Sequence, residues 1–414
     1  MNSEGRIGAL TARPKRASAI PQEFSADSAG FSAKHALILN CGSSSLKFAL
    51  FRMDPEPQRL IAGVTEELGS SKPKSRAENM QGELLWSASV SAADYKTAVE
   101  DAITRLEQSG QFGSIDFVGH RIVHGGPDCD CPVPLTPTIE RRLRRLIPLA
   151  PLHLPANLEG VAAARARLPG AQHCASFDTA FHRSAPRLAQ MTGLPPAYET
   201  DEIRRYGYHG LSYEFIVEDI ARREGKAALN ARIIVAHLGS GASMAAISDG
   251  RSIETTMGFS TAAGLPMATR SGDLDPGLLL YLIEEKGRSP QDARELIFHR
   301  SGLLGLSGET GDMKSLTAPN ASEAAKLAVE YFCYAARKQI GALAAALGGL
   351  DRIVFTGGIG ARSAIVRRRI CEPLSELFAL AINPARNDAS AAIISTPQSR
   401  IRVDVAETDE ELVI

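Results

Sequence analysis

The chain has 414 residues, of which 44% are hydrophobic and 22% charged, and its formal net charge at pH 7 is −1. This composition is typical of a globular protein, and the near-zero charge gives no electrostatic basis for binding nucleic acid or an anionic membrane. No run of about 18 apolar residues occurs, so no transmembrane helix is expected. One ordinary hydrophobic core rarely organises a chain of this length, so two domains are expected.

The start of the chain differs in composition from the rest. Residues 1–34 are rich in Ala, Ser, Arg and Pro and have no apolar periodicity. This composition predicts a disordered extension. The residues also lack the apolar centre of a secretory signal. The cysteines are scattered through the chain, which favours a reducing cytoplasm over a disulfide framework. They are Cys41, Cys129, Cys131, Cys174, Cys333 and Cys371.

Residues 36–51 predict a β-hairpin, because two apolar runs flank a loop of glycine and serine. Glycine allows a close approach to an anion, and the N–H groups and hydroxyls of such a loop can line a phosphate. Lys47 would add a point charge, and Asn40 could bind a metal ion or its water. An ordinary surface hairpin is the alternative, and the spacing is not that of a P-loop.

Two further segments place charged side chains beside predicted strands. Residues 116–126 predict a short strand closed by two glycines, and its Arg121 can reach a small anion with a planar guanidinium group. Asp178 follows the next predicted strand, at the edge where α/β proteins often hold active-site carboxylates. The alternatives are a salt-bridged arginine, which the residues alone favour, and a helix N-cap.

A histidine and an arginine occur in glycine-flanked loops further along. His209 comes just before a predicted helix that begins near Ser212. A helix N-terminus is a natural anion site, so His209 could donate a hydrogen bond to a transferring phosphoryl group, although a lone histidine is more often structural. Arg270 lies in a loop from which an exposed arginine can reach a ligand.

Residues 232–254 repeat the pattern of the opening hairpin. A constant offset of 197 residues superposes Asn40 on His237 and Gly42 on Gly239. Two halves that each open with a strand, a phosphate loop and a strand indicate a duplicated fold with a nucleotide bound between them.

The last third of the chain adds a glycine loop and an acidic end. Residues 356–360 follow a predicted strand and enter a helix, where an adenosine could lie against the backbone, although this pattern alone is weak. Glu410 or Glu411 could hold Mg²⁺, with a solvated acidic tail as the alternative. A long helix is predicted over residues 322–347, and its apolar stripe belongs to the core.

Together these features suit phosphoryl transfer, which depends on positioned cations, a metal ion and phosphate-binding loops. The chain resembles the acetate kinases of the acetate and sugar kinase, heat-shock chaperone and actin superfamily. The matching stretches occur in family order over residues 36–414. They are LNCGSSSLKF, GHRIVHGG, APLHLPAN, FDTAFH, RYGYHGLS, VAHLGSGAS, GLPMATRSGDLDP, SGLLGLSG, FTGGIG and TDEELVI.

The resemblance implies both a fold class and a reaction. It implies an α/β protein of two duplicated ribonuclease-H-like (actin-like ATPase) domains with the active site in the cleft between them. The N-terminal domain would span residues 35–180 plus 396–414, and the nucleotide-binding C-terminal domain residues 181–395. The reaction would be the reversible, in-line transfer of the ATP γ-phosphoryl group to acetate, giving acetyl phosphate and ADP. Mg²⁺ or Mn²⁺ would be required, and a cytoplasmic homodimer without nucleic-acid or membrane partners is expected.

The resemblance also assigns site residues by their position in the motifs. The catalytic residues would be Asp178, His209 and Arg270, and the metal ligands Asn40 and Glu410. The acetate pocket would comprise Arg121, Val123, Leu152 and Tyr208. The residues at the nucleotide would be Lys47, His237, Leu238, Gly239, Ser240, Gly241, Asp312, Met313, Lys314, Gly358, Ile359, Gly360, Ala361 and Arg362.

Asp178 matches the residue that the family treats as its catalytic acid or base, but we do not expect a literal base. Acetate is already ionised at neutral pH, because carboxyl groups have pKa values of roughly 4–5. We expect Asp178 to orient a Mg²⁺-bound water, or the guanidinium groups of Arg121 and Arg270. Positioning and charge neutralisation by the cations would then do the main work.

Departures from the family pattern gather at the nucleotide. Ser240 stands for the usual Asn of HLGNG, Lys314 for the usual Arg, and Ala361-Arg362 for the usual Glu-Asn of GIGEN. These changes predict altered affinity or selectivity for the phosphoryl donor. Thr261, where the family often has proline, leaves acetate and propionate both open as acceptors.

Three alternatives to an ATP-dependent acetate kinase follow. They are a kinase for propionate or another short-chain carboxylate such as butyrate, a pyrophosphate-using variant, and a nucleotide-binding regulator without turnover. The complete set Arg121, Asp178, His209 and Arg270 argues against the regulator, since a pure binder needs no carboxylate clamp.

Overall fold

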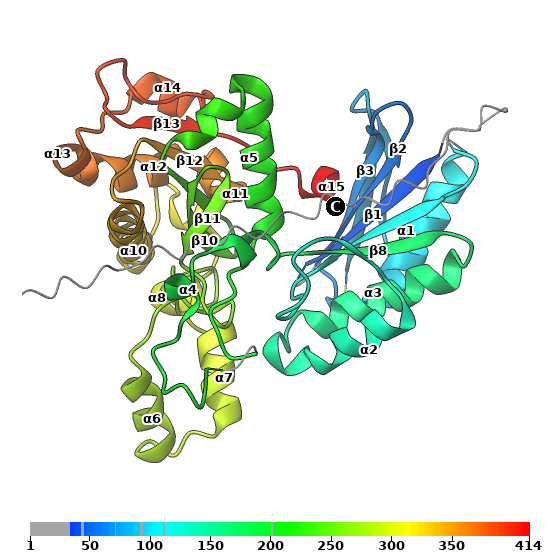
Figure 1. Cartoon of the computed structure of the whole chain (residues 1–414), viewed down its shortest axis with the longest axis horizontal. Helices are drawn as coiled ribbons and strands as arrows, with labels where there is room; N and C mark the ends of the chain where they lie inside the picture. The colour runs from blue at the N-terminus through cyan, green and yellow to red at the C-terminus, as the bar shows by residue number, and fades with distance from the viewer. Residues whose placement is uncertain (1–33, 43–44, 71, 92–93, 111, 200–201) are drawn as a thin grey trace, which may run out of the picture. The chain divides into compact units, whose positions relative to one another are not determined.

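The computed structural model describes residues 34–414 apart from residues 43–44, 71, 92–93, 111 and 200–201. The extension predicted for residues 1–34 therefore lies outside the described residues, except for Lys34. The described part contains two β-sheets, each with helices packed on it (Figure 1).

The first sheet has the strand order β5-β4-β3-β2-β1-β6-β8-β7. Its strands are β1 (His35–Cys41), β2 (Leu46–Arg52), β3 (Gln58–Glu66), β4 (Lys74–Asn79), β5 (Leu84–Ser89), β6 (Phe117–Ile122), β7 (Val133–Pro134) and β8 (Gln172–Phe177). The predicted hairpin is confirmed as β1 and β2, with Asn40 opposite Lys47. Strand β1 also pairs parallel with β6, and β6 pairs parallel with β8. The carboxyl ends of these parallel strands meet at one edge, which brings Asn40, Arg121 and Asp178 together.

The second sheet has the strand order β11-β10-β9-β12-β13. Its strands are β9 (Ile233–Leu238), β10 (Ala242–Ser248), β11 (Arg251–Thr255), β12 (Arg352–Thr356) and β13 (Arg402–Val405). Strand β9 pairs antiparallel with β10 and parallel with β12, as β1 pairs with β2 and β6. The predicted internal duplication is therefore present in the strand topology.

The last strand joins a different sheet from the one expected. The N-terminal domain expected from the sequence included residues 396–414, but β13 pairs parallel with β12 of the second sheet. The buried Arg352 of β12 forms an ion pair with the buried Asp404 of β13 across this strand pair. Only the following helix, α15 (Glu410–Val413), returns to the first sheet, where Ser176 Oγ donates to the Ile414 carbonyl at 3.3 Å.

The helices occupy the connections between the strands. They are α1 (Tyr95–Ser109), α2 (Pro137–Arg145), α3 (Leu154–Arg167), α4 (Arg187–Gln190), α5 (Gly210–Glu224), α6 (Pro276–Glu284), α7 (Pro290–His299), α8 (Gly302–Ser307), α9 (Met313–Leu316), α10 (Glu323–Leu347), α11 (Gly357–Arg362), α12 (Ala364–Cys371), α13 (Ser375–Phe378), α14 (Pro384–Asp388) and α15. Short 3₁₀ helices are η1 (Ile147–Leu149), η2 (Phe181–Ser184), η3 (Lys226–Asn230) and η4 (Glu372–Leu374). No helix within the described ranges is long and apolar enough to cross a membrane.

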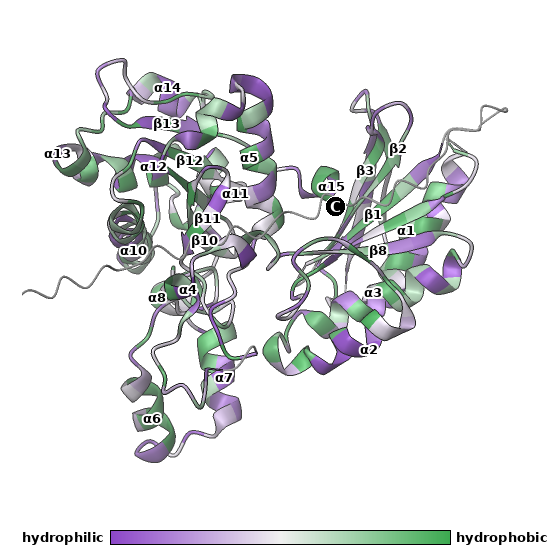
Figure 2. Ribbon diagram, in the orientation of Figure 1, coloured by the Kyte–Doolittle hydropathy of each residue, from purple (hydrophilic) through white to green (hydrophobic). Residues whose placement is uncertain are grey.

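The long helix α10 shows how local sequence and core packing agree. Ser322 caps its first turn by accepting from the Ala325 N–H, and Gly348 ends it with φ at 68°, a conformation that glycine adopts at little cost. Its buried residues include Phe332 and Ile340, which join Phe355 of β12 in one hydrophobic cluster. Figure 2 colours much of strands β10 and β12 of the second sheet as hydrophobic. The strands of the second sheet that lead into the polar loops pack on α10 through this core.

Candidate active site

A pocket of about 560 Å³ lies where the polar loops of both sheets converge. The predicted site residues that line it are Asn40, Lys47, Arg121, Val123, Asp178, Tyr208, His209, His237, Gly239, Ser240, Gly241, Arg270, Gly358, Ala361, Arg362 and Glu410. Leu152, Leu238, Asp312, Met313, Lys314, Ile359 and Gly360 are not among its lining residues. Glu411, the alternative to Glu410 as a metal ligand, also lines it, and residues that line it without having been assigned a role include His153, Gly357, Glu407 and Thr408.

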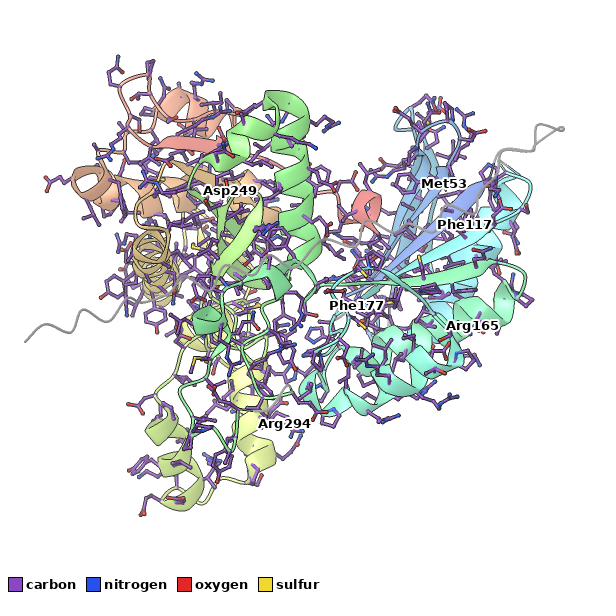
Figure 3. All side chains as sticks on the ribbon, in the orientation of Figure 1. Met53, Phe117, Arg165, Phe177, Asp249 and Arg294 are labelled. Atoms are coloured by element: carbon purple, nitrogen blue, oxygen red, sulfur yellow. The ribbon has the colours of Figure 1, made fainter. Side chains whose placement is uncertain are left out.

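A buried arginine–aspartate pair forms one wall of the pocket. Asp178 directly follows Phe177, which Figure 3 labels at the end of β8. Arg121 Nε donates to Asp178 Oδ1 at 2.9 Å and Nη2 donates to Oδ2 at 2.6 Å. Burial raises the pKa of the Asp178 carboxyl, and the Arg121 guanidinium opposes that rise. Asp178 therefore fixes the orientation of Arg121, one of the two orienting roles that the sequence predicted for it.

Arg121 keeps donors for a substrate. Its Nη1 donates to Asn40 Oδ1 at 2.9 Å, in addition to the two bonds to Asp178. A guanidinium carries about five N–H donors, so a small carboxylate can still be bound at its outer edge. Burial disfavours its charge, but Asp178 and then Glu410 outweigh that effect and raise the pKa of Arg121.

The carboxylates of α15 meet Asn40 beside this pair. Asn40 Nδ2 donates to Glu410 Oε2 at 3.1 Å and to Glu411 Oε1 at 3.0 Å, and the Ser212 hydroxyl donates to Glu410 Oε1. Burial opposes ionisation of Glu410, but Arg121 and then His237 outweigh it and lower the pKa of its carboxyl to about 2. Glu410 is therefore ionised at neutral pH.

This donor set suits a cation that arrives with phosphates. Mg²⁺ is usually held by one or two carboxylates, waters and substrate phosphates rather than by a dedicated cage. No cluster of three His, Cys, Asp or Glu able to hold a metal occurs among the described residues. Glu410 supplies one carboxylate, while the side-chain oxygen of Asn40 is engaged by Arg121.

The rings of His209 and His237, which both line the pocket, stack against each other. Their ring centroids lie 4.4 Å apart with the planes inclined by 26°. His209 has φ at 59° and immediately precedes α5, and Gly210 packs so tightly on the Asp178 carbonyl that a Cβ there would lie 2.2 Å from it. Burial, and then the charge of His237, lower the pKa of His209 well below its usual value. The turn at His209 and Gly210 thus places the imidazole of His209 next to the backbone of Asp178, and burial keeps that imidazole neutral.

Arg270 enters the pocket from the opposite loop. Its Nη1 donates to the Thr261 carbonyl at 3.3 Å, and its Nη2 lies 3.2 Å from His153 Nε2. Burial lowers the pKa of Arg270 to about 10, so the group stays charged at neutral pH. Burial and then the charge of Arg270 lower the pKa of His153 to about 3, so neutral His153 accepts from the guanidinium. The motif that contains His153 was identified from the sequence, but no role was assigned to this residue.

The predicted acceptor and nucleotide contacts are only partly brought together. Val123 and Tyr208 line the pocket, whereas Leu152 does not. At the other end Arg362 of α11 forms an exposed ion pair with Glu407, Nη2 to Oε1 at 3.2 Å. Residues 312–314 lie outside the lining: Asp312 caps α9, and Met313 is buried in the core. Their predicted contact with the nucleotide has no support from the pocket.

Comparison with known proteins agrees with the site. The sequence model of the acetokinase family matches residues 35–414. The chain belongs to the acetokinase family. The acetate kinase of Nitrobacter hamburgensis is 44% identical over 383 residues, covering 91% of this chain and 94% of that protein. The acetate kinase of Rhizobium meliloti is 43% identical over 382 residues, covering 91% and 96%.

Solved structures of similar proteins share the fold. The acetate kinase of Porphyromonas gingivalis superposes with a TM-score of 0.81 at 37% identity, covering 92% of this chain and 98% of that chain. A propionate kinase from Francisella tularensis gives a TM-score of 0.84 at 33% identity, covering 92% and 97%. The fold is therefore the actin-like ATPase fold expected from the sequence, and an acetokinase is a phosphotransferase with a carboxyl group as acceptor.

Proposed function

We propose that the pocket transfers the γ-phosphoryl group of ATP to acetate, reversibly, and gives acetyl phosphate and ADP. The observation that carries this proposal is the meeting of Arg121, Asp178, His209 and Arg270 in one pocket. A carboxylate acceptor fits the outer edge of Arg121, and the developing charge on the phosphoryl group fits the donors of His209 and Arg270.

The proposed step needs no proton transfer. The acetate oxygen forms a bond to the γ-phosphorus while the bond from phosphorus to the bridging oxygen of ADP breaks, and its electron pair leaves with ADP. Asp178 holds Arg121 by two hydrogen bonds, and His153 supports Arg270. Both guanidinium groups are therefore set before substrate binds, which is the main source of rate in such a site.

We propose Glu410 as the protein carboxylate at a Mg²⁺ or Mn²⁺ ion, with Asn40 beside it. The support is the ionised state of Glu410 and its position in the pocket wall. When bound, such an ion would neutralise charge on the donor phosphates. Lys47, opposite Asn40 in the hairpin, would serve the same phosphates.

Propionate is the second candidate acceptor. A propionate kinase is among the similar solved structures, and Thr261 lines the same pocket as Val123 and Tyr208. For the donor, pyrophosphate is the second candidate, because residues 312–314 lie outside the lining while Arg362 adds a charge at the nucleotide end.

Acyl-phosphate formation tests these assignments. The purified protein is given acetate, propionate or butyrate with MgATP, and acetate with pyrophosphate, and the product is trapped as hydroxamate. We expect the fastest turnover with acetate and MgATP. Turnover with pyrophosphate but not with MgATP would show that pyrophosphate is the phosphoryl donor. No turnover with any pair, from folded protein that binds ATP, would refute the proposal.

We further propose a homodimer and a cytoplasmic location. Helix α6 has no buried residue although it exposes Leu278, Leu280 and Tyr281, and Figure 2 colours much of it as hydrophobic. A second copy covering this helix would remove that apolar surface from water. All six cysteines are free thiols, which suits a reducing compartment. Light scattering coupled to gel filtration measures the oligomeric state, and Leu280→Lys should shift it toward monomer.

Each sheet with its helices is proposed to form one domain. The first would comprise residues 34–180 together with α15, and the second residues 181–405. This division keeps β13 with the strand that it pairs with and α15 with the carboxyl edge of β1. Limited proteolysis that cuts first within residues 178–206 or 405–409 would support these boundaries.

A further inference from the structure

We propose that Ser243 and Tyr213 are positioning residues that hold His209 as the neutral tautomer with its proton on Nε2. That N–H would donate a hydrogen bond to the phosphoryl group during its transfer, so this inference rests on the proposed function. Neither residue lines the pocket, and both act on the reaction only through His209.

A short hydrogen-bonded chain connects the three side chains. His209 Nδ1 lies 2.8 Å from Ser243 Oγ, and Ser243 Oγ is hydrogen-bonded to the Tyr213 hydroxyl. Ser243, on β10, and Tyr213, on α5, are both fully buried. The pair thus joins the helix that follows His209 to the strand of the second phosphate loop.

Counting donors and acceptors decides which way the protons point. Among the described residues, Ser243 is the hydrogen-bond partner of the Tyr213 hydroxyl. If the serine donated to the tyrosine, the phenolic O–H would be a buried donor without an acceptor, which costs roughly 1–3 kcal/mol. The tyrosine therefore donates to Ser243 Oγ. The single serine proton is then left for His209 Nδ1, so that nitrogen accepts and Nε2 carries the ring proton.

The protonated nitrogen faces the reacting space. An ideal Cβ built on Gly241 would lie 3.2 Å from His209 Nε2 and 3.8 Å from Arg270 Nη1. Gly241 lines the pocket, so these two nitrogens converge on one small volume beside its backbone. A phosphoryl oxygen in that volume would receive one N–H from each. His209 keeps its proton throughout, because bond formation by acetate and departure of ADP release none.

His182 offers an internal comparison with the same geometry. Its Nδ1 lies 2.8 Å from the buried Ser252 Oγ, and its Nε2 lies 3.0 Å from the Tyr208 carbonyl, which can only accept. His182 therefore carries its proton on Nε2 as well, but it does not line the pocket. Ser252→Ala is thus a control that removes an equivalent serine–imidazole bond from a histidine that does not line the pocket.

The first experiment measures turnover of the full chain. Tyr213→Phe leaves Ser243 free to rotate and should lower kcat about 10-fold, and Ser243→Ala about 100-fold, with KM for acetate and ATP within about twofold. Ser252→Ala and Tyr206→Phe, which removes a buried phenol bonded to the Glu202 carbonyl, should keep kcat within about threefold. A folded Tyr213→Phe variant with unchanged kcat would overturn the proposal.

The second experiment reads the tautomer without turnover. Nitrogen NMR of the histidine-labelled full chain, with the His209 signals identified by their loss in His209→Gln, should show a protonated Nε2 and a bare Nδ1. Tyr213→Phe should convert this to a mixture of tautomers. A wild-type protein with the proton on Nδ1, or on both nitrogens at pH 7, would refute the inference. If no acyl phosphate forms at all, the proposed function fails while the NMR result still decides the tautomer.

Discussion

Filling the space beside Gly241 is the sharpest perturbation of the proposed chemistry. A methyl group there would lie 3.2 Å from His209 Nε2, 3.4 Å from His209 Cε1 and 3.8 Å from Arg270 Nη1. The backbone of Gly241 is outside the left-handed region, so alanine meets no backbone strain. The imidazole must move by a few tenths of an ångström, and the methyl group occupies the position that a phosphoryl oxygen needs.

The expected cost follows from the loss of one donor to the developing charge. Removing a single preorganised donor typically lowers kcat by roughly 10²–10³-fold. We therefore expect Gly241→Ala to fold normally and to lose about 100-fold in kcat, measured by hydroxamate trapping with saturating acetate and MgATP. The melting temperature, followed by circular dichroism, should stay within a few degrees of wild type.

Gly341→Ala is the matched control. Gly341 lies within α10, and a Cβ there would meet nothing within 4 Å. The change should leave kcat unaltered and stabilise the chain by roughly 0.4–1 kcal/mol, because alanine has less freedom in the unfolded state. If folded Gly241→Ala retains at least a third of wild-type kcat, the assignment of the reacting space to His209 and Arg270 is wrong.

Three other perturbations test the acceptor site, a buried arginine and the buried histidines. Arg121→Ala should raise the KM for acetate by at least about 10-fold, in line with the loss of a charged hydrogen bond. An unchanged KM in a steady-state titration would show that Arg121 does not bind the acetate carboxylate. Arg367→Leu should lower the free energy of unfolding by about 3 kcal/mol in urea titration, because it leaves the buried carbonyls of Gly360 and Asn387 without the donors that this guanidinium supplies; a loss below about 1 kcal/mol would show that the bonds are dispensable. Burial lowers the pKa of His120 to about 3 and of His182 to about 4, so they bind protons more weakly in the folded chain. Stability should be complete above the unfolded pKa near 6.5 and fall between pH 6.5 and 4, by about 1.4 kcal/mol per pH unit for each such histidine; a melting temperature constant over that range would contradict this.

Local sequence patterns predicted the elements that build the site. The hairpin of β1 and β2, the strand that carries Arg121 and the extent of α10 follow from apolar periodicity, capping residues and glycines. The repeat between residues 36–51 and 232–254 predicted the duplicated topology, because each hairpin occupies the same place in its sheet.

Contacts between distant segments were beyond such patterns. Strand β13 pairs with β12, and Arg352 meets Asp404 there, although no local sequence period relates the two strands. The support of Arg270 by His153 likewise spans 117 residues. The placement of residues 312–314 was carried over from a resemblance, and the described pocket does not include them.

The function proposed for the pocket of Arg121, Asp178, His209 and Arg270 is phosphoryl transfer to a carboxylate oxygen. The most direct test supplies acetate labelled with ¹⁸O in both oxygens, together with MgATP, and follows the product by ³¹P NMR. We expect acetyl phosphate whose bridging oxygen carries the label, since the acetate oxygen itself attacks phosphorus. No acyl phosphate from folded protein, or a product with an unlabelled bridge, would contradict it.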